Sequence, residues 1–220
     1  MDIDRIKTAL EETDFQYRLK AISALKVYPP EVVVPILIDR IKDPEILVRS
    51  FVAMGLGKQQ TAASFAALIE MIKFDLNPNV RAEAANSLSF FGKAAAPHLS
   101  AAFCQDDHWL VRRSILAALV DLQWHNELYE VCIEALAGED LHLQAAAIAA
   151  LGSLANSNYQ ELALEKLLNF VDTDASLLRQ QLAYALKKIA DPRAKIALNQ
   201  LRQDPDHLVV GAALEELLER

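Results

Sequence analysis

The stretch DPEILVRSFVAMGLG, residues 43–57, carries the pattern that decides the fold. An acid and a proline precede Val48 and Arg49, and a run of apolar and small residues follows as far as Gly57. With the arginine taken as an anchor, equivalent stretches recur at spacings of 31, 32, 31, 32, 35 and 31 residues. The seven anchors are Arg18, Arg49, Arg81, Arg112, Gln144, Arg179 and Val210. Such a constant spacing indicates an internal structural repeat.

Each copy of the repeat contains one amphipathic helix. Positions −1, +3 and +7 from the anchor are apolar in all seven copies, and these positions share one helical face. Position +6 is small in six copies, which lets a neighbouring helix approach closely. The Asp, Asn and Pro residues before each anchor are typical of helix starts.

A second helical segment precedes each of these helices. The sequence predicts it at residues 2–12, 31–42, 62–74, 94–104, 127–137, 159–171 and 193–203. Pro35 and Pro97 each fall inside one of these ranges, where a proline is expected to kink the helix. No segment alternates with a period of two. We therefore expect an all-α fold, an α-solenoid superhelix of about seven helical hairpins, with residues 1–220 forming a single repeat domain.

The string Asp-Pro-x-x-x-Val-Arg-x-x-Ala-x-x-Ala-Leu-Gly resembles the HEAT repeat. Its short period is similar to the HEAT-like subtype named after the phycobilisome bilin lyases of cyanobacteria and red algae. The resemblance covers essentially the whole chain and is specific for the fold. It specifies function poorly, because HEAT-like proteins include scaffolds, assembly factors, lyases and a few enzymes. The residues that carry it best are Asp43, Pro44, Val48, Arg49, Leu56 and Gly57.

The anchor arginines allow two interpretations, a row of anion-binding sites or a structural ladder. Turn acids accompany them, namely Asp14, Asp43, Asp106 or Asp107, and Asp172 or Asp174, with Asn77 in the third copy. A guanidinium can bridge a carboxylate and backbone carbonyls, so we favour the ladder. The ladder is expected to be broken at Gln144 and Val210. Its predicted members are Arg18, Arg49, Arg81, Arg112, Arg179 and Asp43.

Composition restricts the class of partner and the compartment. The chain has 30 acidic and 22 basic residues, a net charge of −8, which argues against a nucleic-acid partner. Two cysteines, Cys104 and Cys132, cannot form a disulfide framework and are expected to be buried thiols. The N-terminus shows no apolar signal region, and no stretch approaches the ~20 apolar residues of a membrane span. We therefore expect a cytoplasmic protein.

No motif for catalysis or metal binding is visible. None of the five histidines is followed by glutamate, whereas a HEAT-like di-iron hydroxylase would be expected to show repeated His-Glu pairs. The G-x-S-x-G, Walker and C-x-x-C motifs are absent as well. The sequence therefore predicts no metal, no catalytic residue and no required cofactor, although a bilin remains open. If the protein is an enzyme, a bilin lyase-like one is expected.

The remaining candidate is the face of each second helix that points away from the core. At 100° per residue this face centres on position +5 and is flanked by +1 and +9. It is nearly neutral and suits a protein partner held in a concave groove. Alternatively, its small residues only permit tight curvature, and its aromatic residues belong to the core. The predicted partner-binding residues are Met54, Asn86, Phe90, Arg113, Trp124 and Tyr184.

The sequence thus favours a non-catalytic adaptor, scaffold or assembly factor that binds a protein partner. The resemblance implies a photosynthetic context, with a phycobiliprotein or another cofactor-bearing protein as the client. One alternative is a bilin lyase or bilin-detaching factor, acting alone or with a paralogous subunit. Another is a chaperone for iron–sulfur or photosystem assembly.

Overall fold

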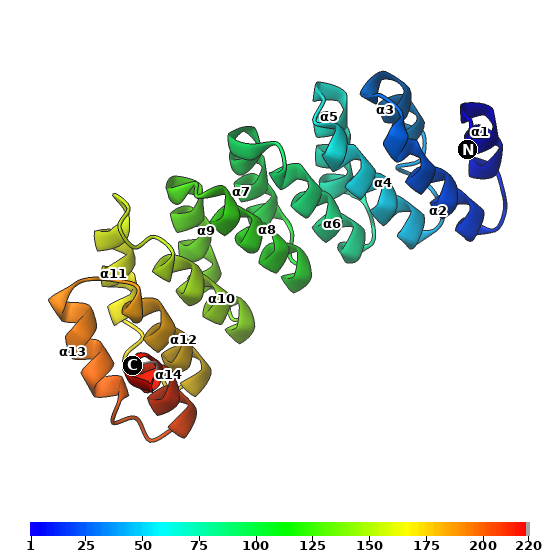
Figure 1. The fold of residues 1–220 in the computed structure, drawn as a ribbon. Helices are drawn as coiled ribbons and strands as arrows, with labels where there is room; N and C mark the ends of the chain where they lie inside the picture. The colour runs from blue at the N-terminus through cyan, green and yellow to red at the C-terminus, as the bar shows by residue number, and fades with distance from the viewer. Residues whose placement is uncertain (219–220) are drawn as a thin grey trace. The chain divides into compact units, whose positions relative to one another are not determined.

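The computed structural model describes the backbone of residues 1–218 and the side chains of residues 1–214. This part of the chain contains fourteen α-helices and two short 3-10 turns, with no strand (Figure 1). The first helices of the seven pairs are α1 (Ile3–Leu10), α3 (Pro30–Ile38), α5 (Ala62–Phe74), α7 (Ala96–Gln105), α9 (His125–Ala137), α11 (Gln160–Leu168) and α13 (Pro192–Leu201). The second helices are α2 (Phe15–Ala24), α4 (Ile46–Gln59), α6 (Pro78–Ser89), α8 (Trp109–Leu122), α10 (Leu141–Gly152), α12 (Ser176–Lys187) and α14 (His207–Leu218). The predicted α-solenoid of seven hairpins is confirmed.

The predicted helix ranges overlap every first helix, and α5 agrees at both ends. The prediction of a kink at Pro97 is wrong. A 3-10 turn, η2 (Gly92–Ala95), occupies the start of the predicted range, so α7 begins only at Ala96. Pro97 therefore lies in the first turn of α7, where its missing N–H has no helical partner to lose.

The chain divides inside α8 into two compact units, an N-terminal unit of residues 1–118 and a C-terminal unit that begins at Leu119. The N-terminal unit holds α1 to α7 and most of α8, and the C-terminal unit holds the rest. A single domain over residues 1–220 stays a prediction.

The core of the N-terminal unit is built from the periodic apolar positions. In α4, Val48, Val52 and Leu56 occupy positions −1, +3 and +7, and all three are fully buried. Leu88 is the corresponding +7 residue of α6 and is also fully buried. The +7 residue of the last copy, Leu217, lies outside the described side chains. Burial at these positions is what holds neighbouring hairpins together.

Small residues bring neighbouring second helices into close contact. A Cβ added at Gly57 of α4 would lie 2.8 Å from Ser87 Cβ and 2.9 Å from the Ser87 carbonyl oxygen of α6. In the C-terminal unit, a Cβ added at Gly152 would lie 2.8 Å from the Cα of Ala185. In both cases position +8 of one helix faces the small +6 residue of the next. Second helices pack against each other more extensively than first helices do, so they form the inner layer within each unit.

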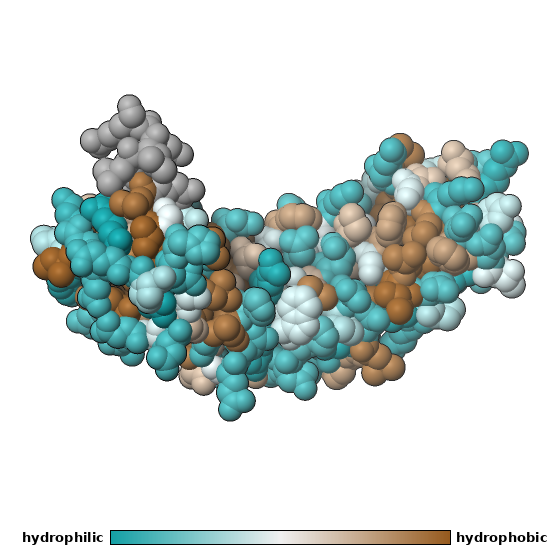
Figure 2. Space-filling view, turned by 90° about the horizontal axis from the view of Figure 1, so that it is seen from below, coloured by the Kyte–Doolittle hydropathy of each residue, from teal (hydrophilic) through white to brown (hydrophobic). Residues whose placement is uncertain are grey.

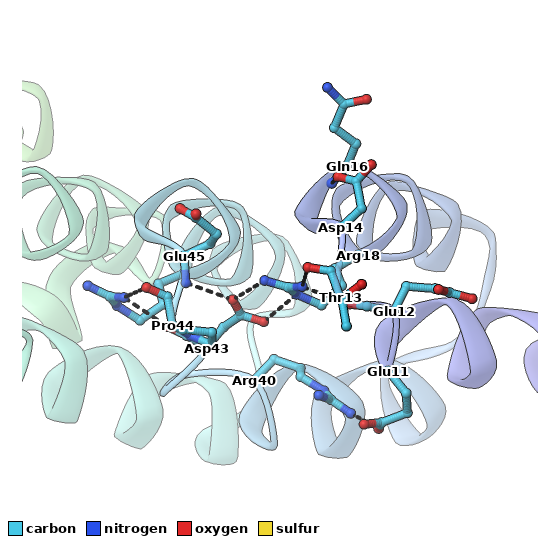
Figure 3. A network of polar contacts seen from close by, with 11 residues as sticks. Glu11, Glu12, Thr13, Asp14, Gln16, Arg18, Arg40, Asp43, Pro44 and Glu45 are labelled. Carbon is cyan, nitrogen blue, oxygen red and sulfur yellow. Dashed lines mark hydrogen bonds and ion pairs between the residues drawn. The ribbon is translucent and has the colours of Figure 1, made fainter.

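Arginines at the anchor positions connect successive turns. Arg18 donates from Nε and Nη2 to the two carboxylate oxygens of Asp43, at 2.9 and 3.0 Å, and both side chains are buried. Its Nη1 donates to the carbonyl oxygens of Glu12 and Thr13 in its own turn (Figure 3). The same two-oxygen pairing recurs between Arg49 and Asp75, Arg81 and Asp106, and Arg179 and Asp204.

Two of the acids that the sequence indicated, Asp43 and Asp106, belong to this ladder, but each pairs with the arginine of the preceding repeat. Each arginine takes backbone carbonyls from its own turn, and the carboxylate comes from the following repeat, 25 or 26 residues later. Asp14 instead caps α2 by accepting a hydrogen bond from the Gln16 amide. Arg112 donates to the Asp106 carbonyl and lies over the Phe103 ring, and it forms no ion pair with any described residue. Gln144 donates only to carbonyls of its own turn, at Leu136 and Gly138.

Candidate functional site

The inner layer of the N-terminal unit carries a hollow of about 410 Å³ on α4, α6 and α8. Its lining comes from positions −2, +1, +2 and +5 of the repeat, which point away from the core positions −1, +3 and +7. We refer to these four positions on α4, α6 and α8 as the groove face. The hollow is lined by Ser50, Asn79, Ala82, Glu83, Asn86, Leu110, Ser114 and Ala117.

The hollow exists because its floor is made of small side chains. Ala82 of α6 is buried, Ser50 occupies the same position, +1, on α4, and Ala117 occupies position +5 of α8. The close contact of α4 with α6 at Gly57 fixes the backbone spacing, so larger side chains would fill the space. A groove of this kind is a consequence of small residues on the inner helices, and its chemistry depends on the few longer side chains at its wall.

Glu83 is the carboxylate in the wall of the hollow. Its side chain is half-buried and accepts a hydrogen bond from Ser87 Oγ at 3.3 Å. Burial raises the pKa of Glu83 above its ordinary value, and hydrogen bonds from Ser87 and Asn86 only partly oppose this. Among residues 1–214, no Lys, Arg or His side chain forms an ion pair with Glu83. A carboxylate in this environment retains hydrogen-bonding capacity that the chain does not use.

An apolar stripe on α4 borders the hollow. Leu47, Phe51 and Met54 occupy positions −2, +2 and +5 of α4, and their residues are 52%, 38% and 38% exposed. The same positions hold Asn79, Glu83 and Asn86 on α6, which packs directly against α4. The groove face therefore changes from apolar on α4 to polar on α6 over one helix spacing.

The predicted partner-binding residues of the N-terminal unit lie on or near this face. Asn86 lines the hollow, and Met54 belongs to the apolar stripe. Arg113 is exposed on α8, and the pairing with Glu83 or Asp121 that its position allows does not form. Phe90 is 51% exposed at the end of α6, where its carbonyl oxygen accepts a hydrogen bond from Gln60 Nε2 at 2.9 Å.

Two predicted residues belong to the C-terminal unit. Trp124 is half-buried and caps the start of α9, directly after Gln123, whose φ of 52° places it in the left-handed region. Tyr184 is half-buried on α12, and Lys187 Nζ lies 4.8 Å from the centre of its ring. The hollow is formed without these two residues.

Seven of the eight residues that line the hollow are not among the partner-binding residues predicted from the sequence, and Asn86 is the exception. The polar ones among the seven are Glu83, Ser50, Asn79 and Ser114. The predicted inner face centres on +5 with +1 and +9 as flanks, whereas the exposed stripe runs through −2, +2 and +5. These positions are four and three residues apart, which is the ordinary spacing of one helical face. Applying that spacing to α4 would have picked out Leu47, Phe51 and Met54 together.

Two other hollows, of about 530 and 350 Å³, flank the turn between α5 and α6. Phe74 and Leu76 of this turn are 66% and 95% exposed. Figure 2 shows hydrophobic side chains gathered on the surface of the N-terminal unit, at the right of the view. The ladder residues Asp75 and Arg81 are part of these linings and are already paired. The hollow on α4, α6 and α8 differs from these two because its wall contains the half-buried Glu83, which forms no ion pair with any described residue.

The sequence matches the HEAT-repeat family over residues 3–75, 34–120 and 129–219. The chain belongs to the HEAT-repeat family. Similar solved structures include the complex of CpcE and CpcF of a Nostoc phycocyanin lyase, with 20% identity, a TM-score of 0.54, and 99% of this chain and 95% of that chain covered. Human deoxyhypusine hydroxylase is similar with 19% identity, a TM-score of 0.50, and 98% and 94% of the two chains covered. At these identities the likeness establishes the shared fold. No curated protein sequence matches the chain.

The described residues also show whether a metal site is present, how exposed the two cysteines are, and whether any helix could span a membrane. Within them, no group of three or more His, Cys, Asp or Glu side chains could hold a metal ion. Cys132 is buried, and burial raises the pKa of its thiol. Cys104 is exposed, so the expectation that both thiols are buried is wrong for it. No helix in the described part of the chain is long and apolar enough to cross a membrane.

Proposed function

We propose that this HEAT-repeat protein is a non-catalytic adaptor or assembly factor that binds a protein partner on the groove face of its N-terminal unit. The observation that carries the proposal is the apolar stripe of α4 beside the polar hollow of α6 and α8. Exposed apolar side chains grouped next to a concave polar wall are typical of protein interfaces. A curved inner layer of helices supplies a rigid surface of this kind without any catalytic group.

Site-specific cross-linking tests this function directly. A photoreactive amino acid replaces Met54 on the groove face, and in a control protein it replaces Ile196, which is 68% exposed on α13. In extracts of the source cell, we expect a discrete adduct with a partner protein from position 54 and none from position 196. Adducts from position 196 with none from position 54 would place the interface elsewhere.

A phycobiliprotein is the client that we propose to test first. The short repeat period resembles that of the phycobilisome lyase subtype, and one similar structure is a phycocyanin lyase complex. That structure contains two named chains, so a second, related subunit is a further partner to test. In this proposal the protein acts in the cytoplasm, and the client carries any bilin.

A bilin lyase or bilin-detaching factor is the alternative within the same client class, and an iron–sulfur or photosystem assembly chaperone is the alternative outside it. Mixing the protein with a free bilin and an apo-phycobiliprotein separates lyase from adaptor. An adaptor leaves the bilin removable under denaturing conditions. A lyase produces visible absorbance that stays with the client chain on a denaturing gel, and a detaching factor removes it from the loaded client.

A further inference from the structure

We propose that the hollow receives a lysine or arginine side chain of the partner, which pairs with Glu83 while apolar side chains of the same segment pack on Leu47 and Met54. This inference rests on the proposed function and names the chemistry of the partner at that face. It follows from the contacts of Glu83, from the lining of the hollow and from the charge of the chain.

Glu83 lacks a cation although several lie close in the sequence. Arg81, two residues earlier, is committed to Asp106 at 2.6 Å, and Arg49 of α4 is committed to Asp75 at 2.6 Å. Arg113 of α8 is exposed and makes no ion pair with Glu83. The 3.3 Å contact from Ser87 is long for a hydroxyl donor, so it satisfies the carboxylate weakly. Burial raises the pKa of Glu83, which reflects the same lack of compensation for its charge.

The lining of the hollow suits a lysine or arginine side chain better than a metal ion. No Lys, Arg or His is among its lining residues, whereas side-chain oxygens come from Ser50, Ser114, Asn79 and Asn86. A lysine ammonium offers three donors and an arginine five, and both can share them between a carboxylate and neutral oxygens. A divalent metal ion would need more carboxylate or oxygen ligands than a single glutamate provides at one point.

The surroundings of the hollow describe the rest of the partner segment. Leu47, Phe51 and Met54 form an apolar strip one helix away from Glu83, so the partner has apolar side chains a few residues from its cation. The net charge of −8 attracts a basic segment over a longer range. Together these features describe a short basic and apolar peptide segment as the ligand.

The experiment selects peptides from a phage-displayed library of random 12-residue sequences. Three proteins are used as bait: the wild-type protein, Glu83→Gln and a Leu47→Ser/Met54→Ser double variant. We expect wild type to enrich peptides with a Lys or Arg beside apolar residues. Glu83→Gln is expected to keep the apolar preference and lose the basic one, and the double variant is expected to lose both. Glu31→Gln, an exposed acid on α3, serves as the matched control and should select as wild type does.

A synthetic copy of the selected peptide makes the test quantitative. Replacing its basic residue with norleucine is expected to weaken binding to wild type at least tenfold and to Glu83→Gln less than twofold. Equal loss for both proteins, or selected peptides without a basic residue, would overturn the pairing with Glu83 and leave the proposed function intact. Selection unaffected by Leu47→Ser/Met54→Ser would overturn the proposed function as well. The melting temperature of Glu83→Gln should not fall, and a clear fall would show that Glu83 serves the fold.

Discussion

Single residues decide how closely the inner helices of the N-terminal unit approach. The sequence signal for this contact is readable, because position +6 is small in six of the seven copies. The sequence does not show which residue contacts this small side chain. Only the spacing between neighbouring helices shows that Gly57, at position +8, faces Ser87. Glu83 illustrates the same limit. Its residue type suggests a solvated surface acid, and its half-buried, unpaired state depends on the helices on either side.

Gly57→Ala is expected to lower the free energy of unfolding by about 1–3 kcal/mol, because overpacking forces backbone shifts. The added Cβ would lie 2.9 Å from the Ser87 carbonyl oxygen, which cannot move away without displacing α6. Urea denaturation of the purified variants measures the effect. Gly211→Ala is the control, since a Cβ there meets nothing within 4 Å. Because alanine favours a helix over glycine, Gly211→Ala should be neutral or stabilising. A loss of similar size at both positions would contradict the close contact with Ser87 as the cause.

Leu88→Ala is expected to cost about 2–5 kcal/mol, because it removes a fully buried side chain and leaves a cavity between repeats. Met54→Ala, at an exposed position of the groove face, should leave the denaturation midpoint nearly unchanged. Near-equal midpoints for the two variants would contradict the assignment of positions −1, +3 and +7 to the core.

At the scale of helices and turns, the ladder shows what periodicity can and cannot predict. The recurrence of arginine at a fixed position indicates a repeated structural contact, and four of the five arginines make it. The partner carboxylate lies in the next repeat, so its identity depends on how hairpins stack. Arg112 has Ala137 and Gly138 at distances of 25 and 26 residues, where the other four arginines have their aspartate. The same stacking fixes the floor of the hollow, which no single repeat contains.

Arg81→Met is expected to destabilise the protein by about 3–5 kcal/mol, because it leaves Asp106 as an uncompensated buried charge. Arg112→Met is the matched control. It removes a carbonyl hydrogen bond and a cation–π contact without exposing an unpaired carboxylate, so its loss should be clearly smaller. Chemical denaturation of both variants at neutral pH gives the comparison, and equal losses would contradict a structural role for the pairing.

The ladder also predicts weakening in acid. Hydrogen bonds from Arg179 lower the pKa of Asp204 below its usual range; at Asp106, burial acts in the opposite direction and is outweighed by the bonds from Arg81 and the His108 amide. A carboxyl whose pKa is lower in the folded state stabilises it above the unfolded pKa of about 3.9 and loses that contribution as pH falls through the folded value. Unfolding free energy measured from pH 7 down to pH 2 should therefore drop below about pH 4. The drop should be smaller in an Arg81→Met/Asp106→Leu variant, and an identical drop would rule out this pair as a cause.

At the scale of the whole chain, periodicity establishes the family and the number of hairpins, and the structure adds where polar and apolar side chains meet on the inner layer. All seven helix pairs follow from a pattern of about 31 residues. Function does not follow in the same way, because the repeat pattern constrains the core positions and leaves the groove face free to vary. On this chain that face carries an apolar stripe on α4 and a carboxylate on α6, and these two features define the proposed partner site.

The affinity of the cross-linked partner for a Leu47→Ser/Met54→Ser variant tests the central claim most directly. Both side chains are exposed, so the variant should melt at the wild-type temperature. We predict that titration calorimetry gives a dissociation constant at least tenfold larger than for wild type, which is a loss of about 1.4 kcal/mol in binding free energy. Ile196→Ser, on α13, should bind as wild type does. Unchanged affinity for the double variant, with a loss for Ile196→Ser, would contradict a partner site on the inner face of α4, α6 and α8.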